Sequence, residues 1–130
     1  MTLFKPVNEK KAPAKVKKIF NTIKKERKIK FIPNFWKTIA NDPETLERTW
    51  TSLKQVMKKG PLDSLTKELL YIAVSMTNSC EYCIRSHTAA AKKKGMTEKM
   101  LKELIAIVGM ANETNKLVES YQVEVDSFLK

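Results

Sequence analysis

The chain has 130 residues, of which 42% are hydrophobic and 30% are charged, and its formal net charge is +11. A chain of this length has room for one domain with a core of its own. Its longest apolar run, LLYIAV at 69–74, is far too short to span a membrane, and residues 1–15 hold no apolar stretch typical of a secretory signal. This composition argues against a membrane protein and favours the cytoplasm, where cysteines normally stay reduced.

The positive charge is concentrated near the N-terminus. Residues 1–30 contain 11 Lys/Arg and 2 Asp/Glu, a net charge of +9, whereas residues 31–130 contain 14 and 12, a net charge of +2. We expect residues 1–12 to form a flexible basic arm and residues 13–130 to form a single all-helical domain. The lysine-rich segment lacks the interleaved aromatic residues of a nucleic-acid-binding surface, so no specific nucleic-acid partner is expected.

The first half of the domain shows helical spacing of its apolar residues and no alternating β-branched run. A first amphipathic helix is predicted over residues 13–28. Its apolar positions follow the i, i+3, i+4, i+7 pattern and are Val16, Ile19, Phe20 and Ile23. A short helix then opens at Pro33, with Phe31, Phe35 and Trp36 as apolar residues, and a longer one carries Leu46, Trp50, Leu53 and Met57 up to Gly60. The large aromatic residues are expected to pack in a core or a subunit contact.

The second half predicts further helices. One begins after Asp63, a good N-cap residue, and runs to about Asn78. The next one starts near Cys80 and ends at Gly95. Thr97 is suited to cap another helix, and a break near residues 111–113 is expected before a last helix with Leu117, Tyr121, Val125 and Phe128. The predicted fold is all-α, a compact bundle of about six helices with the CxxC motif at the start of the fourth.

The most informative segment is NSCEYCIRSHTAAA at residues 78–91. It contains both cysteines and the single histidine of the chain. Their spacing of three and four residues places Cys80, Cys83 and His87 along one face of a helix. Cys80 is expected in the first turn of that helix, where backbone N–H groups and the helix dipole favour a thiolate.

Glu68 is the candidate partner of this cluster on the preceding helix, where it lies between apolar residues. If the two helices form an antiparallel hairpin about Ser79, Glu68 lies about 16 Å down one arm and His87 about 12 Å up the other. The two side chains can therefore meet directly or through a water molecule. We expect burial to keep Glu68 protonated and the imidazole to pass protons between it and a thiol, which gives a Glu–His–Cys relay that generates thiolate.

The same residues allow other functions. Cys80, Cys83, His87 and Glu68 offer four ligands for zinc, although the second, separated ligand pair of a structural zinc site is missing. A c-type haem site is excluded because Ile84 follows Cys83. The cysteines and the histidine can also be ordinary core residues, or they can belong to a non-catalytic redox sensor or assembly module whose CxxC pair changes state without turnover.

The pattern of Glu, eleven residues, CxxC, three residues and His in ELLYIAVSMTNSCEYCIRSH resembles the alkylhydroperoxidase D-like branch of the carboxymuconolactone decarboxylase family. FIPNFWKTIANDPETLERTW and AAAKKKGMT are similar to further segments of its peroxidase-related members, so the resemblance covers residues 14–110. It implies an all-helical fold and assembly into trimers or hexamers. It also implies reduction of hydroperoxides or disulfides with electrons from a dithiol, either a small thiol or a lipoyl- or thioredoxin-like protein. We expect no metal or organic cofactor.

The resemblance also implies roles for individual residues. Glu68 and His87 would form the proton relay, and Cys80 and Cys83 would be the redox pair of a peroxidase-like thiol oxidoreductase. Spacing alone leaves open which thiol attacks, and we favour Cys83 as the attacking residue and Cys80 as its resolving partner. Tyr82 occupies a position where the best-known alkylhydroperoxidase has a second histidine, so it is a possible accessory residue.

Overall fold

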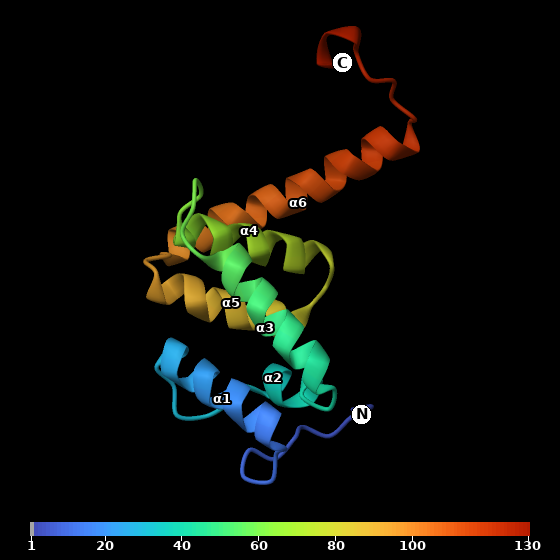
Figure 1. Ribbon diagram of the computed structural model, residues 1–130. Coiled ribbons are helices and arrows are strands. Elements are labelled where there is room, and N and C mark those ends of the chain that lie inside the picture. The colour runs from blue at the N-terminus through green and yellow to red at the C-terminus, as the bar shows by residue number, and fades with distance from the viewer. Residues whose placement is uncertain (1) are drawn as a thin grey trace. The chain divides into compact units, whose positions relative to one another are not determined.

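The computed structural model describes residues 2–130, and within that range it contains six α-helices, a C-terminal 3-10 helix and no β-strand (Figure 1). The all-α fold expected from the spacing of apolar residues is confirmed. The described residues group into two compact units, residues 2–56 and Met57–Lys130. None of the helices in residues 2–130 combines the length and the apolar character needed to cross a membrane.

The first unit contains α1 (Ala14–Arg27), α2 (Asn34–Ile39) and α3 (Pro43–Met57) up to Val56. Its core forms where the apolar faces of these helices meet, as predicted for Trp36 and Trp50, whose rings pack edge to face with centroids 5.2 Å apart. Phe31 and Phe35 are exposed instead. The largest side chains buried in this core are Val16, Phe20, Ile23, Ile32, Trp36, Leu46 and Trp50.

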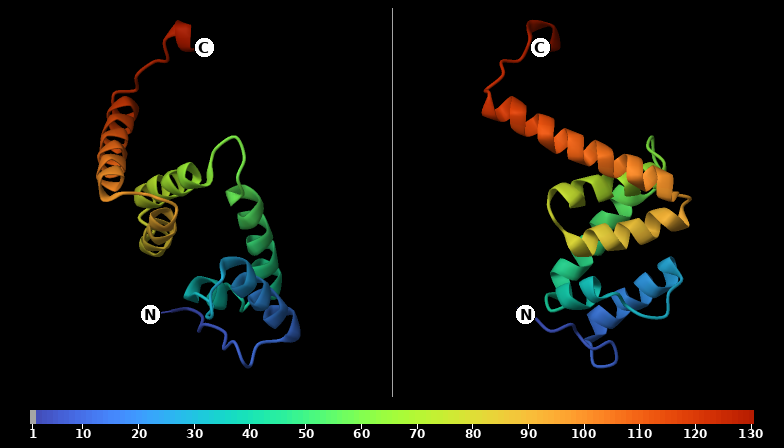
Figure 2. Two further views of the ribbon diagram at one scale, coloured as in Figure 1. Left: turned by 90° about the vertical axis from the view of Figure 1, so that its left-hand side faces the viewer. Right: turned by 180° about the vertical axis from the view of Figure 1, so that it is seen from behind.

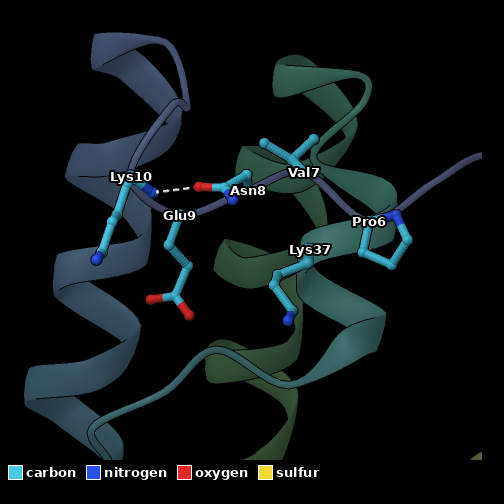
Figure 3. A pocket seen from close by; sticks show the side chains of 6 residues that line it. All are labelled: Pro6, Val7, Asn8, Glu9, Lys10 and Lys37. Atoms are coloured by element: carbon cyan, nitrogen blue, oxygen red, sulfur yellow. Dashed lines mark hydrogen bonds between the residues drawn. The ribbon is translucent and has the colours of Figure 1, made fainter.

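A flexible basic arm is predicted over residues 1–12, and from Lys5 onward this segment contacts α2 and the turn that follows it. The Asn41 side-chain amide donates to the Lys5 carbonyl at 2.8 Å, and the Val7 N–H donates to the Lys37 carbonyl at 2.9 Å. A pocket of about 450 Å³ lies beside this segment. Figure 3 shows the side chains that line it, which are Pro6, Val7, Asn8, Glu9, Lys10 and Lys37. The contacts tie the segment to α2 and its following turn, whereas its mobility in solution stays a prediction. Met1 lies outside the described residues.

The second unit contains α4 (Ser64–Thr77), α5 (Glu81–Lys93), α6 (Glu98–Ser120) and the 3-10 helix η1 (Ser127–Leu129). Two of its helices start at the predicted caps. The Asp63 carboxylate accepts the Thr66 N–H at 2.8 Å, and the Thr97 hydroxyl accepts the Met100 N–H at 3.1 Å. Helices α4 and α5 run antiparallel side by side, and α6 lies against α4 (Figures 1 and 2).

The core of the second unit is small and lies between these three helices. Ile72 of α4 and Ala91 of α5 are fully buried, and Met96 of the α5–α6 connection is almost so. Because Ala91 has only a methyl group, α5 can approach α4 closely at this level. Partly buried residues complete the cluster, namely Leu65, Leu69, Met76, Met100, Leu101 and Leu104.

The C-terminal region differs from the prediction. The break expected near residues 111–113 is wrong, because α6 continues through it to Ser120. The segment holds no proline, and the Asn112 side-chain amide donates both to the Val108 carbonyl one turn earlier, at 2.7 Å, and to the Thr77 hydroxyl of α4, at 3.1 Å. The last predicted helix is also wrong, since only Ser127–Leu129 are helical beyond α6. Counting the short α2, the helix that the CxxC motif opens is the fifth.

Candidate active site

The CxxC motif forms the turn from α4 into α5. Asn78 is the C-cap of α4, and Ser79 adopts a left-handed φ of 56°, which reverses the chain. Cys80 is the N-cap of α5 rather than a residue of its first turn, so the predicted position is wrong by one residue. The Cys80 sulfur accepts the Cys83 backbone N–H at 3.4 Å. A sulfur thus stands where a serine or aspartate oxygen usually caps a helix, at the positive end of the helix dipole.

Cys80 and Cys83 are joined in a disulfide, with their Cα atoms 5.4 Å apart. Both residues are partly buried. In general, free backbone N–H groups and the positive end of a helix dipole stabilise a thiolate. The cysteine pair thus forms a disulfide at the positive end of the α5 dipole.

The carboxylate of Glu68 and the imidazole of His87 are in direct contact, as the hairpin geometry predicted. Glu68 Oε2 lies 2.7 Å from His87 Nδ1, and the two side chains are 6% and 16% exposed. The contact joins α4 to α5, and His87 lies one turn after Cys83 on the same helix. A buried carboxylate, an imidazole and a cysteine pair thus follow one another along the α4–α5 hairpin.

Lys94 is a second partner of Glu68 and is absent from the predicted site. Its Nζ atom lies 2.8 Å from Glu68 Oε1, and its side chain is 34% exposed. Lys94 is the C-cap of α5 and follows His87 by seven residues, or two helical turns. This spacing was a usable signal, because residues at i and i+7 lie on the same face of a helix.

The ionisation of Glu68 differs from the prediction. Burial on its own raises the pKa of Glu68, but the hydrogen bonds from His87 and Lys94, together with their charges, outweigh it and hold that pKa below its ordinary value. The expectation that burial keeps Glu68 protonated is therefore wrong. Since a carboxylate can only accept hydrogen bonds, His87 must donate through Nδ1–H, and Nε2 is then the ring nitrogen that can take up a proton.

Tyr71 is a further contact of His87 that sequence reasoning missed. The two rings are stacked, with centroids 3.7 Å apart and planes inclined by 22°. Tyr71 follows Glu68 by three residues on α4, so one face of α4 presents both side chains to His87. Stacking fixes the plane of the imidazole, and the Glu68 contact fixes its rotation within that plane.

Two other predictions concern Tyr82 and zinc. Tyr82 lies between the two cysteines in the first turn of α5 and is 45% exposed. Its role as an accessory residue stays a prediction.

Among residues 2–130, no group of three or more His, Cys, Asp or Glu side chains is arranged to hold a metal ion. In this state the two sulfurs are bonded to each other, and the ring nitrogen Nδ1 of His87 is engaged by Glu68.

Comparison with curated proteins finds relatives that match part of the chain. Uncharacterized protein 4 in the cox locus of Paracoccus denitrificans is 36% identical over 52 residues, which are 40% of this chain and 47% of that protein. Uncharacterized protein YdfG of Bacillus subtilis (strain 168) is 37% identical over 49 residues, which are 38% of this chain and 33% of that protein. The chain thus spans less than half the length of these curated relatives.

Comparison with solved structures and families covers more of the chain. The crystal structure of the alkylhydroperoxidase AhpD core from Rhodospirillum rubrum ATCC 11170 matches with a TM-score of 0.94 and 44% sequence identity, covering 100% of this chain and 98% of that one. Residues 43–123, more than half of the chain, match the carboxymuconolactone decarboxylase family. The chain therefore belongs to the carboxymuconolactone decarboxylase family and has an AhpD-like all-helical fold, as its Glu, CxxC and His pattern predicted.

Proposed function

We propose that this protein is a thiol-dependent oxidoreductase that reduces hydroperoxides through Cys80 and Cys83. The observation that carries the proposal is the Cys80–Cys83 disulfide at the start of α5, on the same helix as a His87 whose Nδ1 is held by the buried carboxylate of Glu68. Membership of a family that includes an alkylhydroperoxidase core of the same fold supports it.

In the first half of the cycle, His87 Nε2 accepts the thiol proton of Cys83. The thiolate attacks the terminal oxygen of the hydroperoxide, the O–O bond breaks, and Cys83 becomes a sulfenic acid. The departing alkoxide takes the proton from His87 and leaves as an alcohol. Throughout this exchange the Glu68 carboxylate holds Nδ1–H and stabilises the imidazolium, a role that an ionised carboxylate fulfils without carrying a proton itself.

In the second half, Cys80 resolves the sulfenic acid. Its sulfur attacks Cys83, a disulfide forms, and water leaves with the remaining thiol proton. The Cys83 N–H that contacts the Cys80 sulfur favours the thiolate needed for this attack. A dithiol donor, either a small thiol or a lipoyl- or thioredoxin-like protein, then reduces the disulfide by thiol exchange. The same chemistry accommodates a disulfide as the oxidised substrate.

The proposal includes the setting in which the enzyme works. We propose that it acts in the cytoplasm, where a dithiol donor is available, and that it assembles as a homo-oligomer, a trimer or hexamer. Exposed apolar residues on α6 support the assembly, because an unbroken helix with no buried residue gains most from packing against another chain. They are Ile105, Ile107, Met110, Leu117 and Val118.

The test is a steady-state assay of the purified protein with an excess of dithiol and an organic hydroperoxide. We expect hydroperoxide loss that depends on the protein and stops in Cys83→Ser, whereas the control Ser86→Ala, at an exposed position of the same helix, keeps the wild-type rate. A wild-type protein that consumes neither hydroperoxide nor a small disulfide overturns the proposal. A change of oligomeric state on oxidation would then favour the redox sensor, and stoichiometric zinc would favour the metal site.

A further inference from the structure

We infer that Lys94 is a positioning residue of the redox centre. The ammonium group of Lys94 holds Glu68 as an oriented carboxylate, and this carboxylate fixes His87 as the Nδ1 donor. The inference rests on the proposed function for its catalytic consequence. The contact between Lys94 and Glu68 is a property of the fold, and an NMR titration that requires no activity tests it. Neither the motif nor the comparisons assign a role to this lysine.

The geometry divides the carboxylate between two partners. Lys94 Nζ lies 2.8 Å from Oε1, and His87 Nδ1 lies 2.7 Å from Oε2. With one donor on each oxygen, the carboxylate cannot rotate about its last bond without breaking both contacts. The Glu68 side chain is only 6% exposed, whereas that of Lys94 is 34% exposed. The ammonium group thus reaches from the surface to a carboxylate that has almost no contact with water.

The end of α5 is built to deliver this ammonium group. As the C-cap, Lys94 donates its backbone N–H to the carbonyls of Ala90 and Ala91, and Gly95 with its φ of 104° turns the chain away. Ala91 lies between His87 and Lys94 on the same face of the helix and is fully buried.

The charged groups that act on Glu68 come from α5. They are His87 and Lys94, and Tyr71 of α4 is the further titratable side chain there, stacked on His87. The α6 residues that pack against the core cluster include the apolar Met100, Leu101 and Leu104. Lys94 is therefore the permanent positive charge that balances the buried carboxylate.

Removing that charge has a defined chemical consequence. With His87 as its only partner, the buried Glu68 would be protonated more easily, because burial disfavours the charged form. A protonated Glu68 cannot stabilise an imidazolium and no longer requires the Nδ1–H tautomer of His87. As the pH falls, the variant would then lose the base that activates the thiol at a higher pH than the wild type does.

The direct experiment is a carboxyl titration by carbon-13 NMR of protein labelled at glutamate. The Glu68 resonance is assigned by its absence in Glu68→Gln. We expect its midpoint to move to higher pH in Lys94→Met, and to stay at the wild-type position in Lys94→Arg and in Lys92→Met, an exposed control on the last turn of α5. An unchanged midpoint in a folded Lys94→Met variant overturns the inference, and so does a shift of equal size in Lys92→Met.

A second readout follows the tautomer and the activity. Because His87 is the only histidine of the chain, its ring nitrogen-15 signals need no further assignment. They should show the Nδ1–H form in the wild type. As the pH falls, Lys94→Met should lose this form at a higher pH than the wild type does.

In the peroxidase assay, kcat/KM of Lys94→Met should fall about tenfold on the acid side of the optimum, little on the alkaline side, and recover in Lys94→Arg. A uniform loss at every pH means a merely structural role and contradicts the inference. If the wild type is inactive, the proposed function fails while the NMR titration still decides the role of Lys94.

Discussion

Replacing Glu68 with glutamine removes one charge and almost no volume. The variant keeps an oxygen that can accept the Nδ1–H of His87, but it loses the carboxylate that Lys94 contacts at 2.8 Å. Because the Glu68 side chain is only 6% exposed, water has almost no access to the position of the lost carboxylate and cannot replace its charge there. We therefore expect the variant to fold with a lower free energy of unfolding at neutral pH.

The size of the loss follows from the two contacts. A hydrogen bond to a charged group contributes about 1.5–3 kcal/mol. The bond to His87 is weakened rather than lost, and that to Lys94 is discounted because a third of this side chain is exposed and its ammonium group can turn to water. Together they predict a decrease of about 2 kcal/mol in the free energy of unfolding at neutral pH.

The loss should depend on pH with a definite sign. The pKa of Glu68 in the folded protein lies below its ordinary value, because the hydrogen bonds from His87 and Lys94 outweigh burial, which alone would raise it. Such a carboxylate adds stability above its unfolded pKa and loses that contribution as the pH falls through the folded pKa. The gap between wild type and Glu68→Gln should therefore close in acid.

The assay is urea denaturation of the oxidised proteins at fixed protein concentration over a series of pH values. Glu81→Gln is the matched control, since Glu81 is 79% exposed and pairs with Arg85 on the surface of α5. That control should be as stable as the wild type at every pH. A Glu68→Gln variant of wild-type stability at neutral pH, or a deficit that stays constant into acid, would refute the reasoning.

Three further predictions concern packing, ring position and assembly. Ile72→Ala should lower the free energy of unfolding by about 3 kcal/mol because it empties a fully buried site. The control Leu3→Ala, at a position 95% exposed, should leave the free energy of unfolding unchanged in the same denaturation assay, and equal effects of the two variants would contradict the assignment of the core. Tyr71→Ala should slow hydroperoxide reduction about threefold to tenfold, because it releases the stacked imidazole of His87. Tyr71→Phe keeps an aromatic ring and should react at the wild-type rate, whereas an alanine variant at the wild-type rate would mean that stacking has no role. Met110→Glu should dissociate the proposed homo-oligomer, as measured by light scattering after size-exclusion chromatography, and an unchanged mass would exclude this part of α6 from the interface.

Much of the architecture could be predicted because it depends on local signals. The caps at Asp63 and Thr97 appear where short polar side chains precede apolar periodicity, and both accept the expected N–H groups. The contact between Glu68 and His87 also followed from the sequence, since a constant rise per residue along two arms of a hairpin brings the two side chains level. Trp36 and Trp50 pack in the core as their spacing indicated.

The features that were missed depend on tertiary neighbours. The charge of Glu68 could not be judged from burial alone, because a lysine two turns beyond His87 supplies the compensating charge. The run of polar residues near Asn112 resembles a helix break. The Asn112 side chain instead donates to a carbonyl of α6 and reinforces the helix that this run is expected to end. Phe31 counts as apolar in any periodicity argument, yet the fold leaves it exposed.

The most direct test of the proposed redox centre is a single-turnover reaction without any external dithiol. Fully reduced protein is mixed with a slight excess of an organic hydroperoxide, and the alcohol formed, the thiols lost and the Cys80–Cys83 disulfide are quantified together. The mechanism predicts one alcohol and one disulfide for two thiols lost, with a rate that falls at least about tenfold in Glu68→Gln. Thiol loss without a Cys80–Cys83 disulfide, or a rate that Glu68→Gln leaves unchanged, would contradict it.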